Sequence, residues 1–177
     1  MNTLLTKTQM DQTFDRMYAQ VLAALPADGV IAIIGIRSNG VPLAERIVKR
    51  LTADLPTRTI HSGSLDVTFY RDDLQTRSST PVARSSELNF DIDAAWILLV
   101  DDVLQTARTI RAALSELHDF GRPAAVRLAV LIDRGGRQLP IAADFVGATL
   151  DIPDAQKVKV QLEETDGQEG TYGVETA

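Results

Sequence analysis

Two adjacent carboxylates stand at the end of an apolar run in the middle of the chain. Asp101 and Asp102 follow AWILLV, residues 95–100, and a polar segment that ends at Thr109 leads into a helical pattern. Ionised carboxylates bind the hydroxyls of a diol or a hydrated magnesium ion. The start of a helix presents unpaired backbone N–H groups, which receive phosphate. A ligand that satisfies both groups carries a phosphate at one end and a diol nearby, as ribose 5-phosphate does.

The doublet also has a plainer interpretation, in which Asp101 and Asp102 cap the following helix and make the end of a strand soluble. An isolated Asp–Asp pair before a helix favours that interpretation. The hydroxyls of Thr106 and Thr109 add hydrogen-bond donors, however, and the whole string ILLVDDVLQTART, residues 97–109, favours a ligand site.

The pattern of apolar residues predicts the elements that position these groups. Continuous apolar runs at 30–35, 95–100 and 124–132 are typical of strands buried on both faces. Helical spacing is found in residues 8–25, 41–55 and 106–120. This alternation predicts an α/β fold with a central parallel sheet flanked by helices. Ligands of such sheets bind beyond the carboxyl ends of the strands, where turns are expected at 36–40, 101–109 and 133–137.

Three further segments complete the organisation expected of a single domain over residues 1–177. Residues 71–94 lack periodicity, and so long an irregular stretch is expected to be a lid. A turn-rich segment followed by the alternating strand KVKVQL predicts a small C-terminal hood over residues 133–162. The glycine-rich and acidic residues 163–177 are expected to form a loosely ordered tail.

The composition narrows the classes of function. The chain has 177 residues, is 45% hydrophobic and lacks cysteine, which excludes disulfides and favours a reducing, cytoplasmic location. No apolar run reaches the roughly 18–20 residues that a membrane span needs, so no membrane association is expected. The net charge is −6, and residues 163–177 hold five acids and no base, so the rest of the chain is nearly neutral. That distribution argues against a general binder of polyanions.

Several segments together resemble one family. ILLVDDVLQTART is similar to the phosphoribosyl-diphosphate (PRPP) binding motif of type I phosphoribosyltransferases. In the order and spacing of the PyrR family, the bifunctional pyrimidine operon regulators and uracil phosphoribosyltransferases, the chain also carries IGIRSNGVPLAERI, GSLDVTFYRDDL, GRPAAVRLAVLIDRGGRQLPIAADFVG and KVKVQLEETD. The resemblance spans about residues 5–166. It implies the type I phosphoribosyltransferase fold and an enzyme, EC 2.4.2.9, that converts uracil and PRPP to UMP and diphosphate with Mg²⁺.

The resemblance also implies roles for particular residues. The ribose and 5-phosphate of PRPP would be held by Asp101, Asp102, Val103, Leu104, Gln105, Thr106, Ala107, Arg108 and Thr109, with Mg²⁺ bound to the two aspartates through water. The diphosphate loop, commonly built on a strained or cis peptide, would be Arg37, Ser38, Asn39 and Gly40. The lid would supply Arg71, Asp72 and Asp73, and the hood would bind the base through Asp133, Arg134, Phe145 and Val146. Glu163 and Glu164 stand where relatives often carry an acid near the magnesium.

Some of these residues have ordinary structural alternatives. Arg37 is also compatible with a surface arginine, the pair Asp72 and Asp73 with an exposed charge run, and Phe145 with a core residue. Relatives assemble as homodimers or larger homo-oligomers, so such an assembly is expected here as well.

Two positions of the PRPP motif depart from the family pattern, because Gln105 replaces a common aromatic and Ala107 a usual glycine. A positive φ at Ala107 would cost about 1–2 kcal/mol. Family members that attenuate transcription bind pyr leader mRNA through a basic surface, but DQTFDRMYAQVLAAL has Arg16 as its only base and Gly136 offers no side chain. The alternative to the enzyme is a non-catalytic regulator that senses PRPP or UMP and binds RNA or a protein partner.

Overall fold

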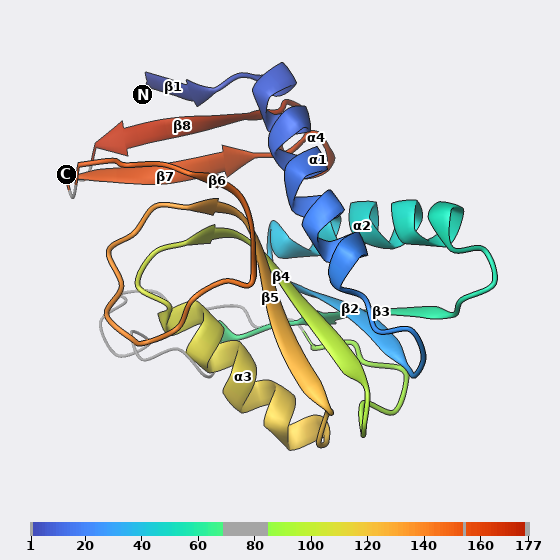
Figure 1. Cartoon of the computed structure of the whole chain (residues 1–177). Coiled ribbons are helices and arrows are strands. Elements are labelled where there is room, and N and C mark those ends of the chain that lie inside the picture. Colours follow the sequence, from blue (N-terminus) through green and yellow to red (C-terminus); the bar gives the residue numbers. More distant parts are fainter. Residues whose placement is uncertain (1, 69–84, 154, 176–177) are drawn as a thin grey trace.

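The computed structural model describes residues 2–68, 85–153 and 155–175. Its main sheet contains five parallel strands in the order β3-β2-β4-β5-β6 (Figure 1). These strands are β2 (Ile31–Ile36), β3 (Ile60–Leu65), β4 (Trp96–Leu104), β5 (Ala125–Asp133) and β6 (Phe145–Thr149). The predicted α/β fold with a central parallel sheet is therefore confirmed.

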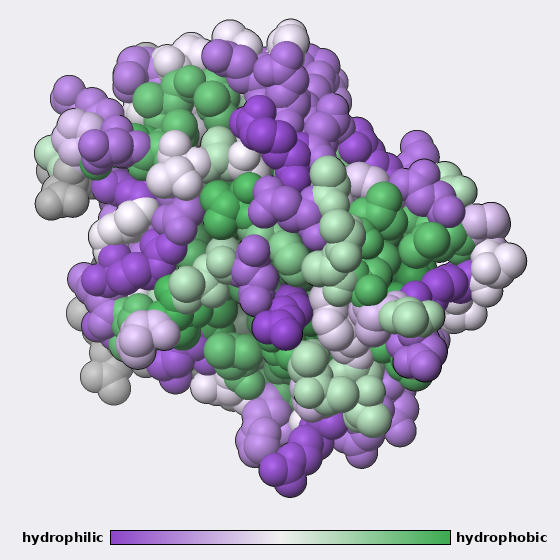
Figure 2. Space-filling model, in the orientation of Figure 1, coloured by the Kyte–Doolittle hydropathy of each residue, from purple (hydrophilic) through white to green (hydrophobic). Residues whose placement is uncertain are grey.

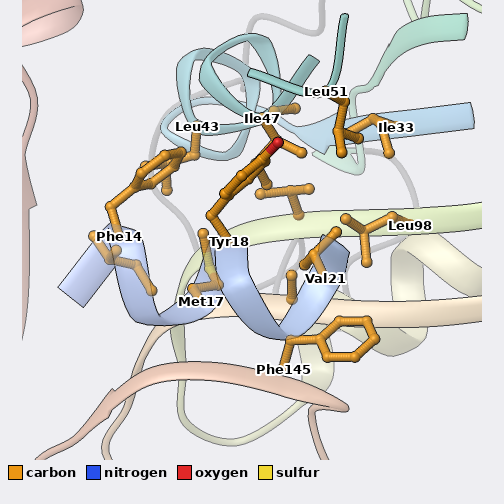
Figure 3. Close-up of a cluster of buried hydrophobic side chains, with 14 of the residues drawn as sticks. Phe14, Met17, Tyr18, Val21, Ile33, Leu43, Ile47, Leu51, Leu98 and Phe145 are labelled. Carbon is orange, nitrogen blue, oxygen red and sulfur yellow. The ribbon is translucent and has the colours of Figure 1, made fainter. Parts of the chain in front are cut away.

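Helices cover both faces of this sheet, as the continuous apolar strands require. Helices α1 (Lys7–Ala24) and α2 (Gly40–Asp54) pack on one face, and α3 (Arg108–Phe120) packs on the other. Side chains of a strand alternate between faces, so Ile33 packs with α1 and α2 while Ile34 packs with α3. Figure 3 shows the first of these two cores, which contains Phe14, Met17, Tyr18, Val21, Leu43, Ile47, Leu51, Ile33, Leu98 and Phe145.

Local signals explain where two of the helices begin. Thr6 caps α1 by accepting a hydrogen bond from the Gln9 N–H, while the Gln9 side chain accepts from the Thr6 N–H. This reciprocal arrangement satisfies two N–H groups that a helix start leaves unpaired. Helix α2 begins at Gly40, where a Cβ atom would lie 2.2 Å from the Val100 carbonyl oxygen. Glycine is therefore needed for α2 to start so close to β4.

A second, antiparallel sheet joins the two ends of the chain. Its order is β1 (Asn2–Leu5), β8 (Gly170–Glu175) and β7 (Gln156–Gln161), and the short helix α4 (Glu163–Asp166) connects β7 to β8. Figure 1 shows this sheet beside the start of α1. We call these three strands and α4 the hood.

The hood differs from the one expected at residues 133–162. Strand β6, within that range, belongs to the main sheet, while the hood takes strands from both termini. The acidic tail was wrongly expected to be loosely ordered, because β8 pairs with both β1 and β7. Thr171 is fully buried there, and Arg46 neutralises Glu164 and Glu169 through ion pairs of 2.6 and 2.7 Å.

Strand β4 also continues further than the apolar run indicated. The prediction ended the strand at Val100, whereas the strand includes Asp101, Asp102, Val103 and Leu104. The reason is the neighbouring strand: β5 extends the parallel ladder to the pair Leu104 and Asp133. A polar residue can occupy a strand end when a partner strand supplies its backbone hydrogen bonds.

The helices and the surface of the molecule mix polar with apolar residues. In the described ranges, no helix is both long and apolar enough to cross a lipid bilayer. Figure 2 shows hydrophilic residues around smaller hydrophobic patches on one face of the molecule. Such a mixture is ordinary for the surface of a globular protein.

Candidate functional site

The turn between β4 and α3 lines a cavity of about 410 Å³. We call residues 104–107 the phosphate turn. The cavity is lined by Asp101, Val103, Leu104, Gln105, Thr106, Ala107, Arg108, Thr109, Ile110, Lys157 and Val158. All but one of the residues predicted to hold the ribose 5-phosphate of PRPP therefore lie at one cavity, the exception being Asp102.

Ala107 adopts the left-handed conformation, with φ 71° and ψ 6°, immediately before α3 begins. The sequence indicated that a positive φ at this position is energetically unfavourable for alanine, where the family usually has glycine. The residue is buried, at 3% exposure, so its methyl group also packs in the core beside α3. This turn brings the start of α3 to the cavity.

The two aspartates occupy opposite sides of β4. Asp101 is 8% exposed and lines the cavity, and its Oδ1 accepts a hydrogen bond of 2.9 Å from the Asp102 N–H. Asp102 faces the loop after β2, where its Oδ2 accepts a hydrogen bond of 2.9 Å from Asn39 Nδ2. The other oxygen, Oδ1, accepts one of 2.8 Å from the Val103 N–H. Both carboxylates are therefore held in defined orientations by N–H donors.

The loop after β2 contains the residues predicted to receive diphosphate. Its Arg37–Ser38 peptide bond is cis, as the resemblance led us to expect. Arg37 donates from Nη2 to Ser64 Oγ over 3.0 Å and to Glu87 Oε1 over 3.2 Å. Its Nε is buried and has no hydrogen-bond partner among the described residues. A buried donor without an acceptor is costly, so this N–H favours a role in binding an anion.

A second cavity, of about 450 Å³, opens beside this loop. It is lined by Arg37, Ser38, Val41, Pro42, Asp66, Thr68 and Thr165. Thr165 comes from α4, and its Oγ1 lies 3.4 Å from Asn39 Oδ1. The loop after β2 thus lies between the Asp102 side of β4 and the hood.

The residues predicted to bind the base are placed elsewhere. Phe145 packs against α1 in the core shown in Figure 3, and the Val146 backbone pairs with the Gln20 side chain. Both stand at the start of β6, away from the carboxyl edge of the sheet. For Phe145 the structure agrees with the alternative of a core residue, because β6 belongs to the main sheet.

Asp133 and Arg134 lie at the carboxyl edge of the sheet, but their side chains form hydrogen bonds with other parts of the protein. Asp133 accepts hydrogen bonds from the Gly135 N–H and, on its other oxygen, from Arg137. Arg134 is buried and donates to the Gln156 carbonyl. Neither residue lines the 410 Å³ cavity. The residues predicted for the lid, Arg71, Asp72 and Asp73, lie outside the described residues.

The acids expected near magnesium are also placed differently. Glu164 is bound by Arg46, whose hydrogen bond holds the pKa of Glu164 below its ordinary value. Glu163 is exposed on α4. The prediction took β7 for the last strand, whereas α4 and β8 follow it and turn these acids toward Arg46 and solvent.

Lys157 and Val158 are cavity residues that the sequence did not identify. They lie on β7 and cover the cavity from the hood side. The alternation in KVKVQL indicated a strand, but no local signal places that strand over a turn fifty residues earlier. Arg137 and Gln138, which contact the phosphate turn from behind, were missed for the same reason.

The donor set suits a magnesium ion that arrives with its ligand. Within the residues described, no group of three or more His, Asp or Glu side chains forms a metal site. Mg²⁺ usually keeps several waters and binds through one or two carboxylates together with substrate phosphates. Asp101 at the cavity suits a hydrated cation, and the Arg37 Nε, which has no hydrogen-bond partner among the described residues, suits the anionic ligand.

Comparison with known proteins identifies a family. The phosphoribosyl transferase domain family matches residues 2–166. A protein named Bifunctional protein PyrR from Pelotomaculum thermopropionicum is 44% identical over 174 residues, which are 98% of this chain and 96% of that protein. Another of the same name, from Chloroflexus aurantiacus, is 53% identical over 137 residues, which are 77% of this chain and 75% of that protein.

Solved structures with the same fold include two purine enzymes. A hypoxanthine-guanine phosphoribosyltransferase from Bacillus anthracis has a TM-score of 0.70 at 14% identity, covering 98% of both chains. The hypoxanthine phosphoribosyltransferase of Trypanosoma cruzi has a TM-score of 0.69 at 19% identity, covering 100% of this chain and 98% of that one. At these identities the likeness shows the fold alone.

Proposed function

This chain belongs to the phosphoribosyl transferase domain family and, within it, to the PyrR proteins, and on that premise we propose that it converts uracil and PRPP to UMP and diphosphate. The observation that carries the proposal is the pairing of Asp101 with the phosphate turn at one cavity. The carboxylate suits the hydroxyls of a ribose, and the N–H groups at the start of α3 suit its 5-phosphate. The loop at Arg37 suits the diphosphate.

The reaction replaces one bond at C1 of the ribose. The C1–O bond to diphosphate breaks with its electron pair on the leaving oxygen, and an oxocarbenium-like centre develops at C1. N1 of uracil then forms the new C1–N bond and loses its proton. No nucleophilic side chain is required, so the residues act by positioning and by stabilising charge.

Each part of the site has a distinct role in this proposal. Asp101 and Asp102 accept hydrogen bonds from the ribose hydroxyls and fix the sugar beneath the incoming base. The Arg37 Nε donates to the departing diphosphate, which satisfies its unpaired N–H. Asp101 and Asp102 would hold magnesium through water, and the bound ion would supply positive charge that neutralises the diphosphate.

The base lies, in this proposal, between the phosphate turn and β7. Val158 offers an apolar surface to one face of the pyrimidine, and the Lys157 ammonium donates to a carbonyl oxygen of uracil. These residues replace Phe145 and Val146, which pack away from the cavity. The preference for uracil rests on the PyrR relatives.

An activity assay across bases tests the proposal. The chain is incubated with PRPP, Mg²⁺ and either uracil, hypoxanthine or orotate, and nucleotide formation is followed. We expect UMP from uracil and little product from the other two bases. Binding of PRPP and UMP with no product from any base would replace the enzyme by the non-catalytic sensor.

The relatives are named bifunctional, and a UMP-responsive regulation of pyr mRNA attenuation is the second activity that we propose to test. Arg16 of α1 donates to the Gly147 carbonyl over 3.1 Å and to Thr13 Oγ1 over 3.0 Å, so its guanidinium is already engaged. A gel shift with a pyr leader RNA, with and without UMP at two salt concentrations, measures this activity. Absence of a UMP-dependent shift at low salt would leave the enzyme alone.

A further inference from the structure

The loop between β5 and β6 lies behind the phosphate turn and binds its backbone. Three consecutive carbonyl groups of the turn each accept a hydrogen bond from this loop. The Leu104 carbonyl accepts from the Arg134 N–H over 3.1 Å, and the Thr106 carbonyl accepts from the Gln138 N–H over 3.1 Å. Between them, the Gln105 carbonyl accepts from Arg137 Nη1 over 3.0 Å.

These contacts determine the direction of three N–H groups. In a planar trans peptide the carbonyl and the following N–H point in opposite directions. Holding the three carbonyls at the back of the turn therefore directs the N–H groups of Gln105, Thr106 and Ala107 away from the loop. None of these N–H groups donates to an acceptor within the described ranges. They are the donors available to a phosphate in the cavity.

Arg137 contacts the turn through its side chain, and its Nη1 donates to the Leu104 carbonyl over 3.5 Å as well as to the Gln105 carbonyl. Its Nε donates to the Ile141 carbonyl over 2.9 Å, and its Nη2 forms an ion pair with Asp133. The guanidinium is thus fixed on both sides before it reaches Gln105. A lysine ammonium could reach one or two of these acceptors. It lacks the planar fork that spans the Ile141 carbonyl, the Asp133 carboxylate and the Gln105 carbonyl.

Gln138 adds a second connection between the same two segments. Its Oε1 accepts a hydrogen bond of 2.8 Å from Arg108 Nε at the start of α3. The loop therefore contacts the phosphate turn at its carbonyls and the helix at its first residue. Arg137 is the residue through which the end of β5 is tied to the middle of the turn.

We infer that Arg137 is a positioning residue for the 5-phosphate of the ligand, acting through the Gln105 peptide and without touching the substrate. The inference rests on the proposed function, because ribose 5-phosphate is taken as the ligand of the phosphate turn. The positive charge of the Arg137 guanidinium lies on the carbonyl side of the turn, so it also aligns the peptide dipoles with their N–H ends toward the anion. Loss of the guanidinium frees the Gln105 peptide to rotate, and the turn then presents fewer aligned donors.

Binding measurements on single variants test the inference without requiring turnover. Ribose 5-phosphate and, separately, diphosphate with Mg²⁺ are titrated into the full chain by calorimetry. Arg137→Ala is expected to weaken ribose 5-phosphate binding by about tenfold or more, and Arg137→Lys by about threefold. Diphosphate affinity stays within about twofold, because the Arg37 loop is separate from the phosphate turn. The KM for PRPP rises in the same order, while the KM for uracil changes little.

Arg127→Ala is the matched control. Arg127 lies on β5, the strand that precedes the loop with Arg137, and forms an ion pair with Asp144 at 3.2 Å, outside the cavity. This variant should bind ribose 5-phosphate as the parent chain does. If Arg137→Ala binds it equally well, or loses both ligands to the same extent, the positioning role is refuted.

Two further comparisons keep the outcome decisive. If Arg137→Ala does not fold, Arg137→Lys decides, because the ion pair with Asp133 is preserved while the fork is lost. Parent-like binding of ribose 5-phosphate by that variant would refute the inference. Failure of the proposed function looks different, since the parent chain would then form no UMP while the variants still differ in ribose 5-phosphate binding.

Discussion

The side-chain amide of Asn39 joins three parts of the site. Its Nδ2 donates to Asp102 Oδ2 over 2.9 Å and to the Val160 carbonyl over 3.1 Å. These acceptors lie on β4 and β7, and Asn39 itself belongs to the loop after β2. One amide therefore orients the Asp102 carboxylate, which we propose binds the ribose, and connects the loop after β2 to the hood.

Replacing this amide by a carboxylate should be more damaging than removing it. Asn39→Asp places a second negative charge against Asp102 and loses the donor to Val160. We expect kcat/KM to fall by about 100-fold for Asn39→Asp and by about tenfold for Asn39→Ala. Like charges raise the pKa of one member of such a pair, so Asn39→Asp should recover relative to the parent as the pH falls from 8 to 6. A constant ratio across that range in steady-state assays would contradict the contact.

Removal of both ribose carboxylates should abolish turnover and leave the fold intact. Asp101→Asn with Asp102→Asn keeps the size of each side chain but loses the anionic acceptors. UMP formation is followed together with circular dichroism and thermal unfolding. The control is Asp28→Asn with Asp151→Asn, which removes two exposed carboxylates outside the site and should keep full activity. Normal activity of the first double variant would mean that the ribose lies elsewhere.

The left-handed backbone at Ala107 predicts opposite tolerances for a smaller and a larger residue. Ala107→Gly relieves about 1–2 kcal/mol of backbone cost but loses a buried methyl and adds chain entropy. These effects nearly cancel, so its free energy of unfolding should stay within about 1 kcal/mol of the parent. Ala107→Val should lose about 2 kcal/mol or more, because β-branched residues avoid positive φ.

Urea unfolding measures both Ala107 variants, and ribose 5-phosphate titration checks that Ala107→Gly keeps its affinity. A valine variant as stable as the parent would show that residue 107 does not hold a positive φ in solution.

Lys157 should affect the base more than the phosphate. We expect Lys157→Met to raise the KM for uracil by about tenfold, because the ammonium donor over the cavity is lost. Lys159→Met removes the same charge from the same strand but outside the cavity, and it should change the KM for uracil by less than about twofold. Steady-state kinetics with each substrate varied in turn separates the two effects. Equal losses in both variants would indicate a general effect of charge on the hood.

Glu116 of α3 should make stability depend on pH. The side chain is 5% exposed, and its Oε1 accepts a hydrogen bond from Ser86 Oγ while its Oε2 has no partner among the described residues. Burial raises the pKa of Glu116 above its ordinary value of 4.5, and the charges of Asp66 and Asp119 act in the same direction. Its stabilising contribution is therefore complete below that ordinary value and is lost as the pH rises through the raised pKa.

Glu116→Gln removes this titration and keeps an oxygen acceptor for Ser86. The difference in Tm between Glu116→Gln and the parent should shift in favour of the variant as the pH rises from 4.5 to 8. Thermal unfolding at several pH values measures the difference. A difference that does not change with pH would show that Glu116 titrates as an exposed carboxylate does.

The sequence by itself determined the features that depend on neighbouring residues. The buried strand before Asp101, the phosphate turn and the start of α3 follow one another directly, so periodicity and helix-start chemistry predicted them together. The same local logic predicted the alternation of strands and helices, and it identified the risk of positive φ at Ala107. These features could be predicted because the apolar periodicity and the helix-start residues that indicate them lie only a few positions apart, although the hydrogen bonds of β4 join it to β2 and β5.

Tertiary structure alone decided which distant residues meet. The ladder with β5 extended β4 past Val100, and pairing with β1 and β7 turned the acidic tail into the central strand of the hood. The contacts of Asn39 with Asp102 and of Arg137 with Gln105 depend on the order of strands in the sheet. So does the position of Lys157 over the phosphate turn. No local pattern encodes such contacts, because they arise only when packing of the apolar faces sets the elements side by side.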